Sequence, residues 1–394
     1  LYHIGPLGTK KVSSNETIPQ YLLPEFSNEG ELYIGVDHCE VPQNVSLLFQ
    51  ISEGSANPDL DKSVVYWHYL LNNEWEPFAD SQILREETNR LLTSGLITFA
   101  LPKHVNNDNT WIEGNQVWIR ASVKASVEAI SDIITIDSQS AKVEFYSYTG
   151  QDKEGDAMTV SPKGTSVEAG TVGKLKKANS AIKGINQKYA SFNGKAAEEG
   201  EAYYLRISER LRHKDRAINL WGYERLLLSQ FPSVYKTKCI NHTYYNGTVA
   251  TYAGLKPGYT SIIVVPDGSI SNASDPLKPK VSKNTLEEIN AYLSIKNSAH
   301  VQLNVQNPIY ESIKISLNVK LKKGFDAGIS LGLLNAALQE ILAPWTQVNG
   351  TEIQFGGQIE KSTIIHRLEK LPYVDYLTCV VMNLHRPAGL TDIS

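Results

Sequence analysis

The chain has 394 residues, of which 41% are hydrophobic and 20% are charged, and its formal net charge is -4. This length exceeds one typical domain core, and the composition is that of a folded chain, so two or three folded domains are expected. The small negative charge excludes a global basic field that would recruit nucleic acid or an anionic membrane. No run of 18 apolar residues occurs, which excludes a transmembrane helix and argues against direct membrane insertion. Residue 1 is Leu and not Met, so we expect the chain to be part of a longer protein.

The N-terminal part of the sequence changes character twice. Residues 1–30 contain three prolines and no sustained periodicity, which predicts an extended connecting arm. Residues 31–150 contain short apolar runs bounded by turn residues, for example 45–51 and 95–101, and this spacing predicts a β-sandwich. Residues 151–200 are dominated by Gly, Lys, Ala and Ser, which predicts a linker with one short helix.

Residues 201–394 are predicted to be an α+β region. Apolar periodicity predicts helices over about 215–230, 327–343 and 360–371, and a further helix around 286–293. The clearest strand spans 309–322, in which apolar and polar residues alternate. We expect it to be central in its sheet and to direct five side chains to the covered face. These are Ile313, Ile315, Leu317, Val319 and Leu321. Strands and helices in this order predict ferredoxin-like packing of helices on one face of a sheet.

Four tryptophans, Trp67, Trp75, Trp111 and Trp118, lie in the predicted sandwich. Flat aromatic platforms on a sandwich can stack on sugar rings, whereas the alternative is that the indoles fill the core or a subunit interface. In the strand 116–123, Trp118 points away from its apolar neighbours. We favour the core or an interface.

No sequence motif marks a catalytic, metal or cofactor site. Nucleophile elbows, phosphate-binding loops and zinc-protease motifs do not occur, so no enzymatic activity and no cofactor are expected. Cys239 and His242 have a spacing that could hold half a zinc site, but no second pair with matching spacing follows. Cys39, Cys239 and Cys379 are expected to be free thiols, because an odd number at wide spacing defines no disulfide framework.

The most distinctive stretch is the segment 206–225, which is rich in arginine and contains two aromatic side chains. The candidate interface residues are Arg206, Arg210, Arg212, Arg216, Trp221, Tyr223, Glu224 and Arg225. Arg, Trp and Tyr are enriched at interface hot spots, and the acidic chain argues against nucleic acid. On one helix, Arg212 and Arg216 would share a face. We therefore predict an assembly or inter-domain contact, with a partner protein as the favoured case; the alternative is that the arginines pair within the chain and brace the helix.

The segment from Arg206 to Thr243, with Gly222-Tyr223-Glu224-Arg225 at its centre, resembles baseplate J-like proteins of contractile injection systems. The resemblance is to the long versions in extracellular and Bacteroidetes particles, in which an arginine precedes a helix with a similar motif, then a proline and a strand. The stretches 47–58, 67–70 and 93–99 resemble the same family, so the resemblance covers most of the chain.

The resemblance implies a structural role as a baseplate wedge subunit of a phage-tail-like particle. Such subunits assemble with a second wedge protein and further copies of themselves, link the central hub and spike to the sheath, and transmit the contraction trigger. It implies assembly in the bacterial cytoplasm, in a particle that is then released or anchored to a membrane. The alternative function is a receptor- or carbohydrate-binding tail protein that uses residues 31–150, and a polysaccharide-cleaving tail enzyme ranks third.

Overall fold

A computed structural model describes residues 2–5, 8–11, 26–112, 115–144, 166–192, 198, 200–245, 252–253, 256–267, 275, 277–343, 345, 355–356 and 359–385. Residues 12–25 of the expected arm, the last residues of the expected sandwich region (145–150) and the first part of the expected linker (151–165) lie outside this set. The chain divides into two compact units, residues 1–141 with 215–394 and residues 142–214. Among the described helices, none is both long and apolar enough to cross a membrane.

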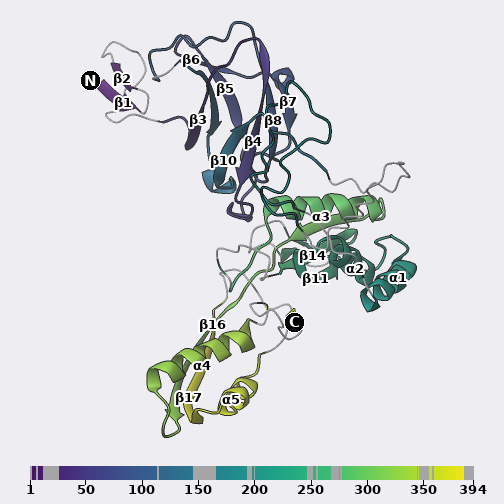
Figure 1. Ribbon diagram of the computed structural model, residues 1–394. Helices are drawn as coiled ribbons and strands as arrows, with labels where there is room; N and C mark the ends of the chain where they lie inside the picture. The colour runs from purple at the N-terminus through teal and green to yellow at the C-terminus, as the bar shows by residue number, and fades with distance from the viewer. Residues whose placement is uncertain are drawn as a thin grey trace. The chain divides into compact units, whose positions relative to one another are not determined.

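Residues 30–138 form a domain of two four-stranded antiparallel sheets, which we call the two-sheet domain (Figure 1). One sheet has the strand order β10-β4-β8-β7 and the other β3-β9-β5-β6. The strands are β3 (Gly30–Val36), β4 (Gln43–Ile51), β5 (Tyr66–Leu71), β6 (Glu74–Pro77), β7 (Ile83–Glu86), β8 (Gly95–Leu101), β9 (Val117–Val123) and β10 (Ile133–Ser138). Single 3-10 turns, Asp80–Gln82 and Val127–Ala129, precede β7 and β10.

The core of the two-sheet domain lies between its sheets because both sheets turn alternate side chains inward. On β4, Val45, Leu47, Phe49 and Ile51 are buried, and the residues between them are more exposed. Side chains of β5, β8 and β9 fill the same core. The packing is largely aromatic: the Trp67 ring centroid lies 5.7 Å from that of Phe49.

A second core belongs to a three-stranded sheet with two helices in the same unit. The sheet order is β11-β14-β15, with β11 antiparallel and β15 parallel to the central strand. The elements are α2 (Leu220–Gln230), β11 (Val234–Asn241), β14 (Tyr259–Pro266), α3 (Lys283–Lys296) and β15 (Gln302–Gln306). Helix α3 is the crossover that makes β14 and β15 parallel. Apolar residues of α2 and α3 cover the sheet, with Leu227, Ile289 and Leu293 fully buried.

The C-terminal described residues build a third core on a two-stranded antiparallel sheet. Its elements are β16 (Ser312–Leu321), α4 (Ala327–Leu342), α5 (Lys361–Glu369) and β17 (Val374–His385). The predicted alternation on β16 is present, and Ile315, Leu317, Val319 and Leu321 pack against this core. The prediction that this strand is central was wrong, since β17 is its only neighbour among the described strands.

The expected ferredoxin-like packing on a single sheet is not what the described part of 201–394 shows, because its helices pack on two separate sheets. The described residues of 201–394 form the β11-β14-β15 sheet and the β16-β17 sheet, and a ferredoxin-like fold would require a single sheet. The expected helices on each sheet are present. Two shorter hairpins complete the described strands: β1 (Tyr2–Gly5) with β2 (Gly8–Lys11), and β12 (Tyr244–Tyr245) with β13 (Tyr252–Ala253).

Candidate functional site

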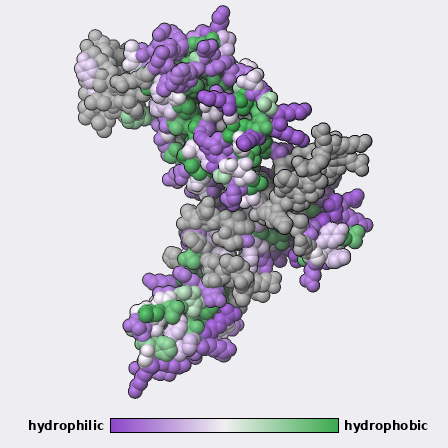
Figure 2. Space-filling model, viewed as in Figure 1, coloured by the Kyte–Doolittle hydropathy of each residue, from purple (hydrophilic) through white to green (hydrophobic). Residues whose placement is uncertain are grey.

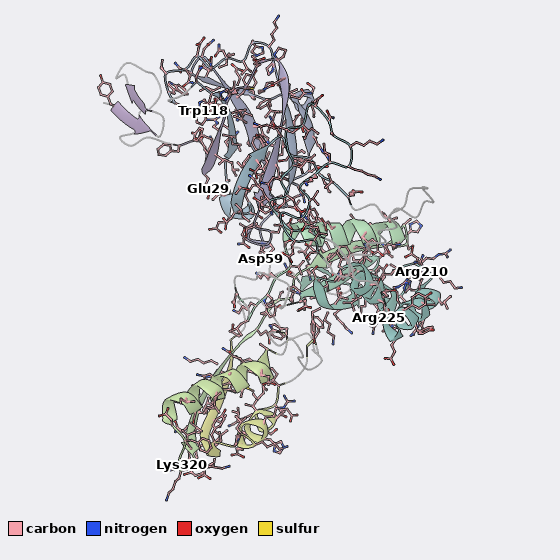
Figure 3. The ribbon with its side chains drawn as sticks, viewed as in Figure 1. Glu29, Asp59, Trp118, Arg210, Arg225 and Lys320 are labelled. Carbon is pink, nitrogen blue, oxygen red and sulfur yellow. The ribbon has the colours of Figure 1, made fainter. Side chains whose placement is uncertain are left out.

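Helix α1 (Glu201–His213) carries the first half of the predicted interface and has no buried residue. Tyr204 and Leu211 are each 71% exposed. Arg210 and Arg212 project from the same helix and are exposed, and Figure 3 labels the first of them. Arg206 instead donates from Nε to both carboxylate oxygens of Glu198, at 2.7 and 2.6 Å. The helix therefore presents an apolar and basic surface, and Arg206 is held by an ion pair inside its own unit.

The predicted helix over 215–230 begins only at Leu220, and this changes the geometry of the arginines. Helix α1 ends at His213, and Lys214 and Asp215 both have left-handed backbone angles, with φ of 51° and 57°. Helix α2 begins only at Leu220, because the side chain of Asn219 caps it by accepting a hydrogen bond from the Gly222 amide (2.7 Å). The prediction that Arg212 and Arg216 share a helical face was therefore wrong. The candidate residues fall into both compact units: Arg206, Arg210 and Arg212 belong to the unit of residues 142–214, and the remaining candidates belong to the other unit.

In helix α2, two of the predicted residues make contacts inside their own unit. Tyr223 is 4% exposed, and its hydroxyl donates to the side-chain oxygen of Asn297. Oε1 of Glu224 accepts a hydrogen bond from the Cys239 amide (3.0 Å). These contacts tie α2 to the end of α3 and to β11, so both residues brace the fold. The guanidinium of Arg225, labelled in Figure 3, is 5.9 Å from the Trp221 ring centroid on the outer side of α2.

We expect Tyr223→Phe to lower the free energy of unfolding by about 1 to 2 kcal/mol, because the change leaves the partly buried Asn297 oxygen without its donor. Urea denaturation followed by circular dichroism measures it. Tyr204→Phe, at an exposed position on α1, is the control and should change stability by less than about 0.5 kcal/mol. Equal stability of the two variants would show that the Tyr223 hydroxyl does not brace α2.

The tryptophans separate into core and surface positions. Trp67 is 7% exposed and belongs to the core of the two-sheet domain, whereas Trp111 is 42% exposed. Trp75 and Trp118 are half-buried on the outer face of the β3-β9-β5-β6 sheet. The Arg120 guanidinium lies 4.7 Å from the Trp75 ring centroid, so one face of this indole is already covered.

The same outer face holds a compact polar cluster around Glu31. Arg120 lies 3.5 Å from a Glu31 oxygen, and the Tyr33 hydroxyl donates to the other oxygen. Burial, together with this bond to Glu31, raises the pKa of Tyr33 to about 12. The indole nitrogens of Trp75 and Trp118 are covered and make no hydrogen bond within the described residues. A sugar resting on this face would not reach these nitrogens without rearrangement.

Two further features bear on catalysis or metal binding. A cavity of about 280 Å³ in the two-sheet domain is lined by two carboxylates, Asp80 and Glu86, beside Trp67. Glu86 accepts hydrogen bonds from the amide (2.8 Å) and the hydroxyl of Thr88, so this carboxylate holds a turn in place. Burial, with the nearby Glu224, raises the pKa of Cys239 to about 12, which keeps the thiol protonated and opposes metal ligation. No metal-ligand cluster occurs among the described residues.

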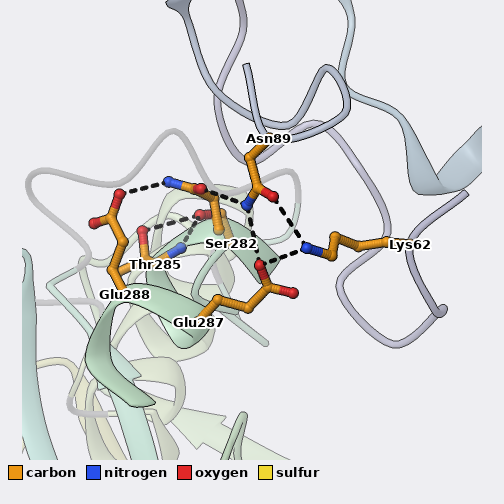
Figure 4. A network of polar contacts seen from close by, with 7 residues as sticks. Lys62, Asn89, Ser282, Thr285, Glu287 and Glu288 are labelled. Carbon is orange, nitrogen blue, oxygen red and sulfur yellow. Dashed lines mark hydrogen bonds and ion pairs between the residues drawn. The ribbon is translucent and has the colours of Figure 1, made fainter. Parts of the chain in front are cut away.

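A network of polar side chains joins the two-sheet domain to the start of α3 within one unit (Figure 4). Lys62 Nζ donates to Glu287 Oε2 (2.8 Å) and to Asn89 Oδ1 (3.0 Å). Asn89 Nδ2 donates to the same Glu287 oxygen (3.0 Å) and to Asn284 Oδ1 (2.8 Å). Desolvation alone would raise the pKa of Glu287, but the hydrogen bonds from Asn89 and Lys62 and the charges of Lys62 and Lys283 lower it below its ordinary value.

An exposed apolar surface covers the outer side of α4. Ile329, Leu331 and Leu333 are 69%, 47% and 52% exposed, and Phe325, just before the helix, is 49% exposed. Figure 2 shows hydrophobic residues gathered over this helix. The helix is therefore apolar on its inner and outer sides, which is typical of a helix that packs against something on both.

Sequence reasoning identified the arginine-rich segment but missed the network around Glu287 and the cluster around Glu31. Lys62 and Glu287 are separated by 225 residues. No local pattern connects two such positions, so a single sequence offered no signal for the contact. The one available signal was residue type: asparagine adopts left-handed backbone angles more easily than most residues, which favours a turn at Asn89.

Comparison with known proteins agrees with the resemblance in the sequence. The family model described as "Baseplate protein PVC11-like" matches residues 2–391. A cryo-EM structure of the anti-feeding prophage baseplate, 6-fold symmetrised, is similar with a TM-score of 0.42 and 15% identity, over 92% of this chain and 75% of that one. No curated protein matches the sequence. Because the family model spans nearly the whole chain, the chain belongs to the PVC11-like baseplate proteins of contractile injection systems.

Proposed function

We propose that the chain is a wedge subunit of the baseplate, which links the central hub and spike to the sheath and transmits the contraction trigger. The observation that carries this proposal is the family match over residues 2–391. The exposed apolar and basic surface of α1 supports it, because a helix without any buried residue stabilises little in its own unit. The role requires contacts that change between two arrangements and needs no chemistry within the subunit.

Within this proposal, the partners are a second wedge protein, further copies of this chain, and proteins of the hub, spike and first sheath layer. The two-sheet domain is then the β-sandwich predicted for residues 31–150. Residues 1–30 are an arm that precedes it, residues 151–200 are a linker that follows it, and residues 201–394 form the wedge region. Assembly takes place in the bacterial cytoplasm. The proposed interface then contains fewer residues than the eight candidates from the sequence. It consists of the exposed side chains of the 206–225 segment, whereas Tyr223 and Glu224 hold α2 in place through contacts inside their own unit.

The exposed part of α1 can be tested by the paired change Arg210→Ala plus Leu211→Ala. Both side chains are exposed, so the isolated chain should keep its melting temperature within about 2 °C, because surface changes of this kind cost little. Particle assembly should fall at least tenfold when sheathed particles are counted by negative-stain electron microscopy. Truncating an arginine and an apolar side chain at the centre of an interface typically weakens binding by this factor or more.

The matched control is Lys174→Ala plus Leu175→Ala, a basic and an apolar residue that are exposed in the same unit but outside α1. This control should assemble normally. Normal assembly of the α1 variant would exclude the helix as an interface. Loss of folding in the isolated α1 variant would show that these side chains brace their own unit instead.

The alternative, a carbohydrate-binding tail protein, has less support from the tryptophans. Trp67 lies in the core, and Arg120 covers one face of Trp75. An open stacking platform needs an uncovered ring face. Of the four indoles in this region, only Trp111 is exposed beyond a third of its surface.

A further inference from the structure

We propose that the two-sheet domain and helix α3 are joined by a polar latch that opens without unfolding either of them. The latch consists of Lys62, Asn89, Asn284 and Glu287 (Figure 4). A second polar contact, between Lys280 Nζ and an oxygen of Asp59, joins the same two parts. This inference concerns how the chain moves, and its test uses the isolated chain and does not depend on the baseplate role.

The side of the latch on the two-sheet domain is fixed by its own backbone. Asn89, Arg90 and Leu91 have three consecutive left-handed φ angles of 50°, 63° and 62°. Such a run is costly for residues other than Gly and persists only where the surroundings hold it. Here Thr88, which is fully buried, accepts hydrogen bonds at its carbonyl from the amides of Leu92 (2.9 Å) and Thr93 (3.0 Å). The turn therefore presents Asn89 in one orientation whether or not α3 is in place.

The α3 side is equally independent of the two-sheet domain. The side chain of Ser282 accepts a hydrogen bond from the Thr285 amide (3.2 Å) and so caps the helix. Ile289 and Leu293, further along the helix, are fully buried in the second core. The start of α3 therefore stays formed by its own cap and packing, and Asn284 and Glu287 remain on it when the latch is open.

The contacts across the latch can be exchanged for water. The two apolar cores share no residue among those described, so separation leaves each core intact. The Lys62 and Glu287 side chains are already 26% and 37% exposed, and a partly exposed ion pair contributes little by itself. The latch therefore holds through several individually weak contacts, which are the Lys62–Glu287 pair, the Lys280–Asp59 pair and the hydrogen bonds that Asn89 donates to Asn284 and Glu287.

The effect of pH on the latch follows from Glu287. Its pKa is lowered in the folded chain, so its stabilising contribution is present above the ordinary glutamate pKa and is lost as the pH falls through the lowered value. The other charged groups at the junction are Lys62, Lys283 and Glu288, with the pair Asp59 and Lys280. Protonation of Glu287 removes the charge that faces Lys62, so acidification below the Glu287 pKa should open the latch.

Electron-spin distance measurement on the full chain tests the proposal. Spin labels are placed at Leu84→Cys on β7 and Ile295→Cys on α3, which are 54% and 86% exposed, with Cys39 and Cys379 changed to Ser. We expect one narrow distance distribution with the native latch. The combined change Lys62→Met, Asp59→Asn and Glu287→Gln should at least double the width of the distribution, with circular dichroism unchanged.

Glu288→Gln is the matched control, because it removes the same charge from the next residue of α3. Glu288 accepts a hydrogen bond from Asn284 on its own helix, and a glutamine side chain can accept the same bond. The control should keep the narrow distribution. The proposal is overturned if the latch variant keeps the native width of the distance distribution, or if the control broadens it equally. It is also overturned if the distribution is already broad with the native latch. Loss of secondary structure in the latch variant would overturn it as well, since the contact would then be part of one cooperative fold.

Discussion

Phe99→Ala is expected to lower the free energy of unfolding of the two-sheet domain by about 3 to 5 kcal/mol. Phe99 is fully buried, and its ring centroid lies 5.0 Å from those of Trp67 and Phe78. Removing the ring loses its transfer free energy and leaves a cavity between aromatic side chains that cannot collapse easily. The loss is large compared with the stability of a typical domain.

Four of the six tryptophans lie in the two-sheet domain, so urea denaturation followed by tryptophan fluorescence reports mainly on this part of the chain. Leu84→Ala on β7, where the side chain is 54% exposed, is the control and should change the free energy by less than about 0.5 kcal/mol. If Phe99→Ala were as mild as this control, the two sheets would not share the core described for them.

Local patterns in the sequence predicted the buried side of the elements that have a clear periodicity. The alternation on β16 and the helical spacing of Leu286, Ile289 and Leu293 are properties of nearby residues. The structure buries the three α3 side chains and partly buries the alternate side chains of β16 from Ile315 to Leu321. The start of α2 could also have been predicted, because Asn219 is a strong N-cap residue followed by an apolar run. The expected start at residue 215 overlooked this signal.

Pairing between distant strands could not be predicted in the same way. The period-two pattern of β16 is the same whether the strand has one neighbour or two, so its position in the sheet depends on partners elsewhere in the chain. The candidate interface shows the same limit. Its arginines are neighbours in sequence, but a left-handed turn at Lys214 and Asp215 separates α1 from α2. Charge composition identified the segment, but the backbone conformation decides which of its side chains lie on α1 and which lie on α2.

The strand β16 provides a direct test of the third core through Ile315→Asp. Ile315 packs against the core formed with α4, α5 and β17, so a carboxylate there would be partly buried without a partner. We expect a loss of about 2 to 4 kcal/mol. Since two strands are marginal without their helices, this part should unfold locally while the rest of the chain stays folded.

Hydrogen exchange followed by mass spectrometry distinguishes local from global unfolding. In Ile315→Asp, the amides of β16, β17 and α5 should lose protection, while those of the two-sheet domain should exchange at the native rate. Ser316→Asp places the same charge on the opposite, exposed face of the same strand and should leave protection unchanged, because its carboxylate stays in water. Equal loss of protection in both variants would mean that β16 does not have one covered and one exposed face. Loss of protection across the whole chain in Ile315→Asp would mean that the third core does not unfold independently of the other two.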